Sequence, residues 1–114
     1  MIYTGYFAMN HRYPKELIRF SIARYTPKGF HVEVIPHLFP HELTLLDYKH
    51  GRIGIEEYKE QYAKVLKKLD AKRLIRECGD HILLCYERPG VFCHRHLVAE
   101  WLREHGVPCE EYKV

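Results

Sequence analysis

The sequence has no long apolar run. Its longest uninterrupted stretch of apolar and aromatic residues covers only residues 82–86, whereas a helix needs about 20 such residues to cross a bilayer. The sequence therefore excludes a transmembrane helix. Its first residues also lack the basic segment and apolar segment that make up a secretory signal. We therefore expect a soluble protein that acts in the cytoplasm.

A strong charge of one sign is also missing. Eighteen Lys and Arg residues and fifteen Asp and Glu residues give a net charge of +3, spread along the chain. This balance does not by itself indicate a nucleic-acid partner, although one stays possible. With 46% hydrophobic and 29% charged residues, the composition excludes a disordered or collagenous chain. A length of 114 residues corresponds to a single domain.

No Cys-x-x-Cys pair occurs among the four cysteines, Cys78, Cys85, Cys93 and Cys109. Structural zinc sites usually contain such closely spaced pairs, and neighbouring residues at a helix start point in different directions. We therefore expect no metal ion and no other cofactor. Without a secretory signal the default compartment is reducing, which predicts free thiols rather than disulfides. Cys85, inside the apolar run, is expected to be an inert core residue.

Hydrophobic periodicity and turn residues predict an alternation of strands and helices. The expected strands are residues 2–6, 18–23, 31–35, 81–87 and 109–112, and the expected helices are 55–69, 71–78 and 93–105. Residues 36–54 are expected to form a loop-rich connection with at most one short helix. This order is typical of an α/β protein. We predict one small Rossmann-like domain over residues 1–114, with a mostly parallel sheet flanked by helices.

The segment between the strand at 81–87 and the helix at 93–105 carries the most chemistry. In parallel sheets, ligands bind at the carboxyl ends of the strands, near the amino ends of helices. Glu87 leaves the strand, residues 89–90 turn the chain, and Cys93, His94 and Arg95 open the helix. The unpaired N–H groups of a helix start attract anions and lower the pKa of a thiol. Arg88 and Arg95 add donors suited to phosphate or carboxylate.

The same segment carries a family resemblance. Residues 83–90, Leu-Leu-Cys-Tyr-Glu-Arg-Pro-Gly, and residues 92–102, which begin Phe-Cys-His-Arg, resemble the signature of the domain of unknown function 488 family, the YeaO-like group. The Ile2-Tyr3-Thr4 strand and the Glu56-Glu57-Tyr58 helix are similar to further family features. The resemblance implies a compact Rossmann-like α/β domain and a site at Cys-His-Arg, but no particular activity. Residues 20–24, Phe-Ser-Ile-Ala-Arg, lack the acidic residue that the family carries before the arginine.

Two kinds of function fit these residues, and both involve an anionic, nucleotide-like ligand. The first is an enzyme, a hydrolase or a transferase, in which Cys93 is the nucleophile and His94 the base, or in which Glu87 attacks or stabilises an anomeric carbon. Cysteine phosphatases are excluded, because their arginine follows the cysteine by six positions and here that position is Ala99. The oligomeric state stays open.

The second is a module that binds a nucleotide or a nucleic acid without catalysis, with Glu87 and Arg95 as a structural ion pair. In either case Arg95 and Arg88 are expected to hold the ligand. Thr4 and Tyr6, at the end of the first strand, are expected near the same crevice. Tyr6, Tyr25 and Phe30 are candidates for stacking on a base.

Overall fold

A computed structural model describes residues 1–74, 79–88 and 90–114. The strands are β1 (Ile2–Tyr6), β2 (Ile18–Ser21), β3 (Glu33–Val34), β4 (His81–Cys85) and β5 (Cys109–Glu111). The α-helices are α1 (Glu42–Lys49), α2 (Ile55–Lys67) and α3 (His94–Glu104). Three short 3-10 helices complete the described elements: η1 (Phe7–Arg12), η2 (Pro36–Leu38) and η3 (Ala71–Arg73).

The five strands form one parallel sheet in the order β3-β2-β4-β1-β5. β4 lies in the middle, and all five of its residues are buried. That position explains its continuous apolar run, because a central parallel strand is covered on both faces. The small α/β domain with a parallel sheet is therefore confirmed.

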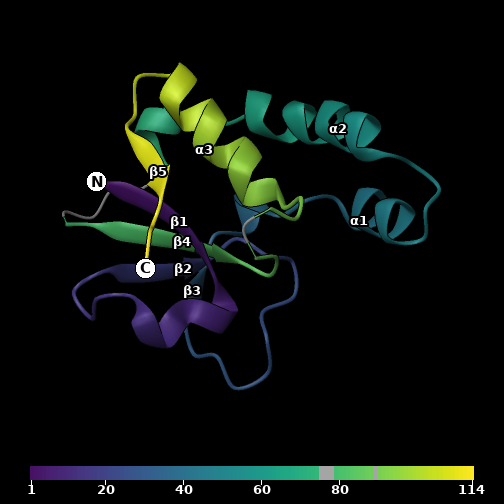
Figure 1. Cartoon of the computed structure of the whole chain (residues 1–114). Helices are drawn as coiled ribbons and strands as arrows, with labels where there is room; N and C mark the ends of the chain where they lie inside the picture. Colours follow the sequence, from purple (N-terminus) through teal and green to yellow (C-terminus); the bar gives the residue numbers. More distant parts are fainter. Residues whose placement is uncertain (75–78, 89) are drawn as a thin grey trace.

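The two faces of the sheet are covered differently. Figure 1 shows α2 and α3 on one side of the sheet and η1 on the other. The larger core cluster lies under the helices and joins Phe20, Leu83 and Cys85 of the sheet to Tyr62 of α2 and Leu102 of α3. The smaller core, on the side of η1, consists of Phe7, Tyr13, Leu17, Ala23, Ile82 and Leu84.

The two longer helices begin in different ways. α2 begins with Glu56 and Glu57 and ends with Lys64 and Lys67, so its charges oppose the helix dipole at both ends. α3 begins after Cys93, which has the extended backbone of an N-cap, with φ −147° and ψ 146°. α3 packs against β1, β4 and β5, and this packing brings its amino end to the carboxyl ends of β1 and β4 (Figure 1).

The strand predicted at 2–6 has the predicted bounds, and the other predicted strands and the helices at 55–69 and 93–105 are present but shorter. The loop-rich connection holds one short helix, α1, as expected, together with the single turn of η2. The helix predicted for 71–78 starts as a 3-10 turn at Ala71–Arg73, and residues 75–78 of that prediction lie outside the described residues. η1 was not predicted, because its six residues show neither helical nor strand periodicity. Among the described residues, no helix combines the length and apolarity that a membrane span requires.

Candidate functional site

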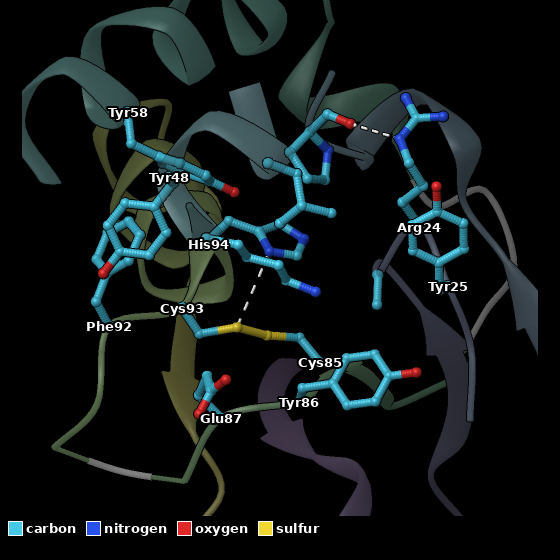
Figure 2. A pocket seen from close by; sticks show the side chains of 14 residues that line it. Arg24, Tyr25, Tyr48, Tyr58, Cys85, Tyr86, Glu87, Phe92, Cys93 and His94 are labelled. Carbon is cyan, nitrogen blue, oxygen red and sulfur yellow. Dashed lines mark hydrogen bonds between the residues drawn. A yellow bond between two sulfur atoms is a disulfide. The ribbon is translucent and has the colours of Figure 1, made fainter. Parts of the chain in front are cut away.

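A pocket of about 390 Å³ opens at the carboxyl ends of β2 and β4. This volume lies within the range of about 300–1,000 Å³ that is usual for small-molecule sites. Its walls come from four parts of the chain: the segment after β2, the segment 40–49, α2, and the segment from the end of β4 to the start of α3 (Figure 2). Three of the seven predicted site residues line it, namely Glu87, Cys93 and His94.

Cys85 and Cys93 are joined by a disulfide in this pocket (Figure 2). This corrects the expectation of free thiols for these two cysteines, and the expectation that Cys85 is inert. The bond forms because Cys85 ends β4 on the face toward α3, while the intervening segment returns Cys93 to the N-cap above it. Cys109 is a buried free thiol, and burial raises its pKa to about 11. Cys78 lies outside the described residues.

A backbone carbonyl in the segment directly after β2 holds the His94 ring in one orientation. Its Nε2 lies 2.7 Å from the carbonyl oxygen of Ile22. Because a carbonyl can only accept, Nε2 carries the proton, and Nδ1 is left as an acceptor 3.9 Å from the Cys93 sulfur. The pKa of His94 is lowered to about 4, mainly by burial and in addition by the nearby positive charge of Arg95, and the Ile22 hydrogen bond only partly opposes this shift. The imidazole is therefore neutral at neutral pH.

Glu87 is the exposed carboxylate of the pocket. In the view of Figure 2 it lies on one side of the disulfide and His94 on the other. Its carboxylate takes part in no ion pair or hydrogen bond found among the described residues, so it remains open to a ligand. Arg88 is also exposed but does not line the pocket, and Pro89 lies outside the described residues.

Arg95 is completely buried and has a different partner from the one expected. Its Nε and Nη2 donate to the two carboxylate oxygens of Glu111, over 3.0 and 2.9 Å. Nη1 donates to the backbone carbonyl of Glu87 and lies 3.6 Å from the Cys85 sulfur. The expected Glu87–Arg95 ion pair is therefore wrong: Glu87 contributes its backbone oxygen, and Glu111 supplies the carboxylate. With its side chain fully enclosed, Arg95 does not line the pocket.

Thr4 and Tyr6 join this arginine rather than the pocket. The Thr4 hydroxyl donates to Glu111 over 2.7 Å, and the Arg95 guanidinium lies 5.5 Å from the centre of the Tyr6 ring. The sequence analysis missed Glu111, although the expected strand at 109–112 contains it. Strand pairing sets Glu111 opposite Thr4, and this register was the information that the sequence did not provide.

The sequence analysis also missed most of the pocket wall. Arg24 follows β2 and donates through Nε to the carbonyl of Pro40, while Lys49 ends α1 and is exposed. Tyr48, Tyr58 and Phe92 form an aromatic wall, with ring centres 5.0–5.5 Å apart. Tyr58 and Phe92 belong to segments that carry the family resemblance, which implied no role for them in a pocket. Tyr48 and Lys49 come from an irregular segment without a motif, so no local signal identified them.

Only some of the residues that were candidates for stacking on a base line the pocket. Tyr25 lines the pocket and is 53% exposed. Phe30 packs edge to face against Phe7, a residue of the smaller core, and does not line the pocket. Tyr86, which had not been considered, lines the pocket and is 47% exposed. The pocket thus has two exposed aromatic rings at its rim.

Comparison with known proteins gives one clear match. Residues 3–106 match the family model DUF488-N3a, described as the active DUF488-N3 subclade. No curated protein and no solved structure shows significant similarity to the chain. The match spans every described helix and strand from β2 to α3 and most of β1, and it includes all of the pocket residues.

Proposed function

We propose that this chain, which belongs to the DUF488 family, binds an anionic, nucleotide-like ligand in the pocket at the carboxyl ends of β2 and β4. One observation carries the proposal. The pocket combines cationic side chains, exposed aromatic rings and a helix amino end around about 390 Å³. A phosphate needs the first and third of these features, and a nucleobase needs the second.

The charge of the pocket favours an anion. Arg24 and Lys49 contribute two positive charges, against one negative charge from Glu87. The Nε of Arg24 is occupied by Pro40, which fixes the guanidinium and leaves its two terminal nitrogens for a ligand. Cys93 makes no side-chain cap for α3, so the first-turn N–H groups of this helix add a further partial positive charge.

The aromatic residues favour a ligand with a flat ring. Tyr25 and Tyr86 are about half exposed, whereas Tyr58 is buried within the wall that it forms with Tyr48 and Phe92. Burial of an exposed tyrosine face against a base is worth about 1–3 kcal/mol per base. The rim tyrosines therefore suit a nucleobase, while the wall holds the shape of the pocket.

The enzymatic version of this function rests on Glu87. With Cys93 bonded to Cys85, Glu87 is the reactive side chain that stays open to a ligand. Its carboxylate would bond to the anomeric carbon as the bond to the leaving group breaks, and water would then release the sugar. The description of the matched subclade as active agrees with an enzyme. Cys93 is the alternative nucleophile once the disulfide is reduced.

His94 is better suited to positioning than to general base catalysis. With a pKa of about 4, the imidazole is a weak proton acceptor at neutral pH, where an efficient general base has a pKa near 7. Its Nδ1 can still accept a hydrogen bond from the reduced Cys93 thiol and so fix the direction of the sulfur. This arrangement therefore favours orientation of the thiol over the general-base role expected from the sequence.

Calorimetry with inorganic phosphate, a nucleoside and the matching nucleotide tests the binding function. We expect the nucleotide to bind more tightly than either part alone, and Lys49→Ala and Tyr25→Ala to weaken it about tenfold each, which corresponds to about 1.4 kcal/mol. Lys64→Ala is the matched control, because Lys64 is exposed on α2 outside the pocket. Equal affinity of wild type, Lys49→Ala and Tyr25→Ala for the nucleotide contradicts the proposal.

A separate experiment distinguishes an enzyme from a binding module. Oxidised and reduced protein are incubated with nucleotides, and release of the base is followed by NMR. In the Glu87 version, release occurs with oxidised protein and is lost in Glu87→Gln but not in Cys93→Ser. Release that requires reduction and Cys93 assigns the nucleophile to the thiol instead. Tight nucleotide binding without release of the base by either form of the protein indicates a binding module that is not an enzyme.

A further inference from the structure

The disulfide and His94 together form a group of three metal-binding side chains. The possible ligand atoms of Cys85, Cys93 and His94 all lie within 4.8 Å of one another, and all three residues are buried. We propose that reduction of the disulfide converts this group into a zinc site. The proposal does not depend on the ligand proposed above, because zinc binding is measured on the protein alone.

The ligand types are those of zinc. Zinc is bound by thiolate sulfur and imidazole nitrogen in proteins. The sequence argued against such a site because Cys93 and His94 are neighbours without a paired cysteine. The fold supplies that cysteine from another element, since Cys85 ends β4 directly beneath the α3 N-cap.

The histidine is already oriented as a ligand. Its Nε2 is bound to the Ile22 carbonyl at 2.7 Å, so the lone pair of Nδ1 is directed to the side of the sulfurs. Metal-binding histidines typically hold their other nitrogen in this way, with a backbone carbonyl or a carboxylate as the acceptor. The distance of 3.9 Å from Nδ1 to the Cys93 sulfur is close to the roughly 3.6 Å that a shared zinc ion requires when its bonds are about 2.0–2.3 Å long.

The backbone also has room for an ion between the cysteines. Their Cα atoms are 7.2 Å apart, beyond the range of about 4.4–6.8 Å that most disulfides span. Two thiolates on one zinc ion are separated by about 3.8 Å, given zinc–sulfur bonds of about 2.3 Å in a tetrahedral arrangement. Rotation of the Cys85 and Cys93 side chains after reduction provides this separation without a change of fold.

Three protein ligands leave one coordination position, and it faces the pocket. Cys85, Cys93 and His94 all line the same cavity, together with Glu87. A site with three protein ligands and an open fourth position is typical of catalytic rather than structural zinc. The open position would take a water molecule or an anionic oxygen of a ligand. Nη1 of Arg95, 3.6 Å from the Cys85 sulfur, would stabilise the negative charge of the Cys85 thiolate by a hydrogen bond.

Reduction and metal binding balance as two steps. A small-molecule dithiol transfers two electrons and two protons to the Cys85–Cys93 disulfide, which yields two thiols and the cyclic disulfide of the reductant. Zinc then displaces the two thiol protons and accepts a lone pair from His94. Zinc binding and the disulfide are therefore mutually exclusive. A zinc-bound Cys93 is also unavailable as a nucleophile, which leaves Glu87 as the reactive residue of the loaded form.

The test compares oxidised and reduced protein. After removal of the reductant without air, each form is incubated with zinc, desalted and analysed for metal, and cobalt is used in parallel because its absorption reports thiolate ligation. We expect one zinc per chain in the reduced protein and none in the oxidised protein. This comparison needs no variant, so it holds even if a substitution disturbs folding.

Variants then assign the ligands. Cys85→Ser and Cys93→Ser are each expected to weaken zinc binding at least 100-fold and to reduce the thiolate absorption of cobalt, because each variant keeps only one of the two thiolates. The double variant Cys78→Ser/Cys109→Ser is the control and should bind like the wild type, because it keeps all three proposed ligands. Equal zinc content of oxidised and reduced protein, or full binding by the Cys85→Ser/Cys93→Ser double variant, overturns the zinc site. Neither result affects the nucleotide-binding test, whose failure would in turn leave the zinc site standing.

Discussion

Arg95 and Glu111 form a two-point ion pair in which Nε and Nη2 of the arginine each face one carboxylate oxygen, at 3.0 and 2.9 Å. The arginine side chain is fully buried and the glutamate is 25% exposed. Since α3 carries the arginine and β5 the glutamate, this pair fastens β5 to the helix whose first residue, His94, lines the pocket. A buried charge of this kind is tolerated only with its partner in place.

Removal of either partner should therefore destabilise the domain strongly. We expect Arg95→Ala to lower the free energy of unfolding by about 3–5 kcal/mol, because Glu111 and the Glu87 carbonyl lose their donor. Urea denaturation measures the change. Arg52→Ala is the control: its ion pair with Asp47 lies at the surface, with the arginine 59% exposed, and its loss should change stability by less than about 1 kcal/mol. Similar effects of the two substitutions would contradict the structural role of Arg95.

The Thr4 hydroxyl gives a finer test of the same cluster. Its hydrogen bond to Glu111 is 2.7 Å long and ends on a charged group, for which a contribution of about 1.5–3 kcal/mol is usual. Thr4→Val keeps the shape and removes the donor, so we expect a loss of stability in this range. Thr4→Ser keeps the donor and should lose less. The order of the two variants in thermal or urea unfolding decides the matter.

Gly5 is required by the close approach of two side chains. A Cβ atom at this position would lie 2.6 Å from the hydroxyl of Tyr13 and 2.8 Å from Ile82. The Tyr13 hydroxyl cannot easily move away, because it accepts a hydrogen bond from the Tyr6 backbone. We expect Gly5→Ala to destabilise the domain by about 1–3 kcal/mol. Gly54→Ala, where an added Cβ meets nothing within 4 Å, should have the smaller effect in the same unfolding assay.

His94 should make the stability of the oxidised protein depend on pH. Its pKa is about 4 in the fold and about 6.5 in the unfolded chain, so the unfolded chain binds more protons between these values. The free energy of unfolding should therefore fall as the pH drops from about 6.5 to about 4, by about 3 kcal/mol in total. Above about pH 6.5 the contribution is constant.

The matched variant for this prediction is His94→Gln. Other groups titrate in both proteins, including His96, whose pKa is also lowered by burial, so only the difference between the two pH profiles reports His94. Urea unfolding of the oxidised proteins at several pH values gives both profiles. Parallel profiles would show that the imidazole is not held neutral in the fold.

Local pattern was sufficient to predict the fold class and the strand and helix between which the pocket opens. The apolar run of β4 and the periodicity of α3 identified the strand and helix that meet at Cys93 and His94, because each signal lies within one element. The wrong predictions all concern contacts between elements. An ion pair of Arg95 with Glu87, eight residues away, was one of two alternatives, and Glu111 was not considered because strand register is not visible in the sequence. Only that register brings Glu111 opposite Thr4.

The two cysteines illustrate the same limit. An apolar run hides which of its residues face α3, so Cys85 was indistinguishable from its neighbours Leu83 and Leu84. The arrangement beside Cys93 depends on the path of the chain between β4 and α3, which alternating patterns do not encode. Lys49 and Tyr48 reached the pocket wall from an irregular segment, for which neither helical nor strand periodicity gives a position.

The strand order has a consequence for how the chain acquires its structure. Within the described part of the chain, β1 pairs with β4 and β5 alone, and β2 pairs with β4 and β3. The first strand of the chain therefore has no neighbour in the sheet until residues beyond 80 have been synthesised. Contacts between such distant residues are slow to form, because the closing of a long loop precedes any gain from pairing. During synthesis β1 therefore stays unpaired until β4 has been made. Because β4 pairs with both β1 and β2, the centre of the sheet forms in one late step.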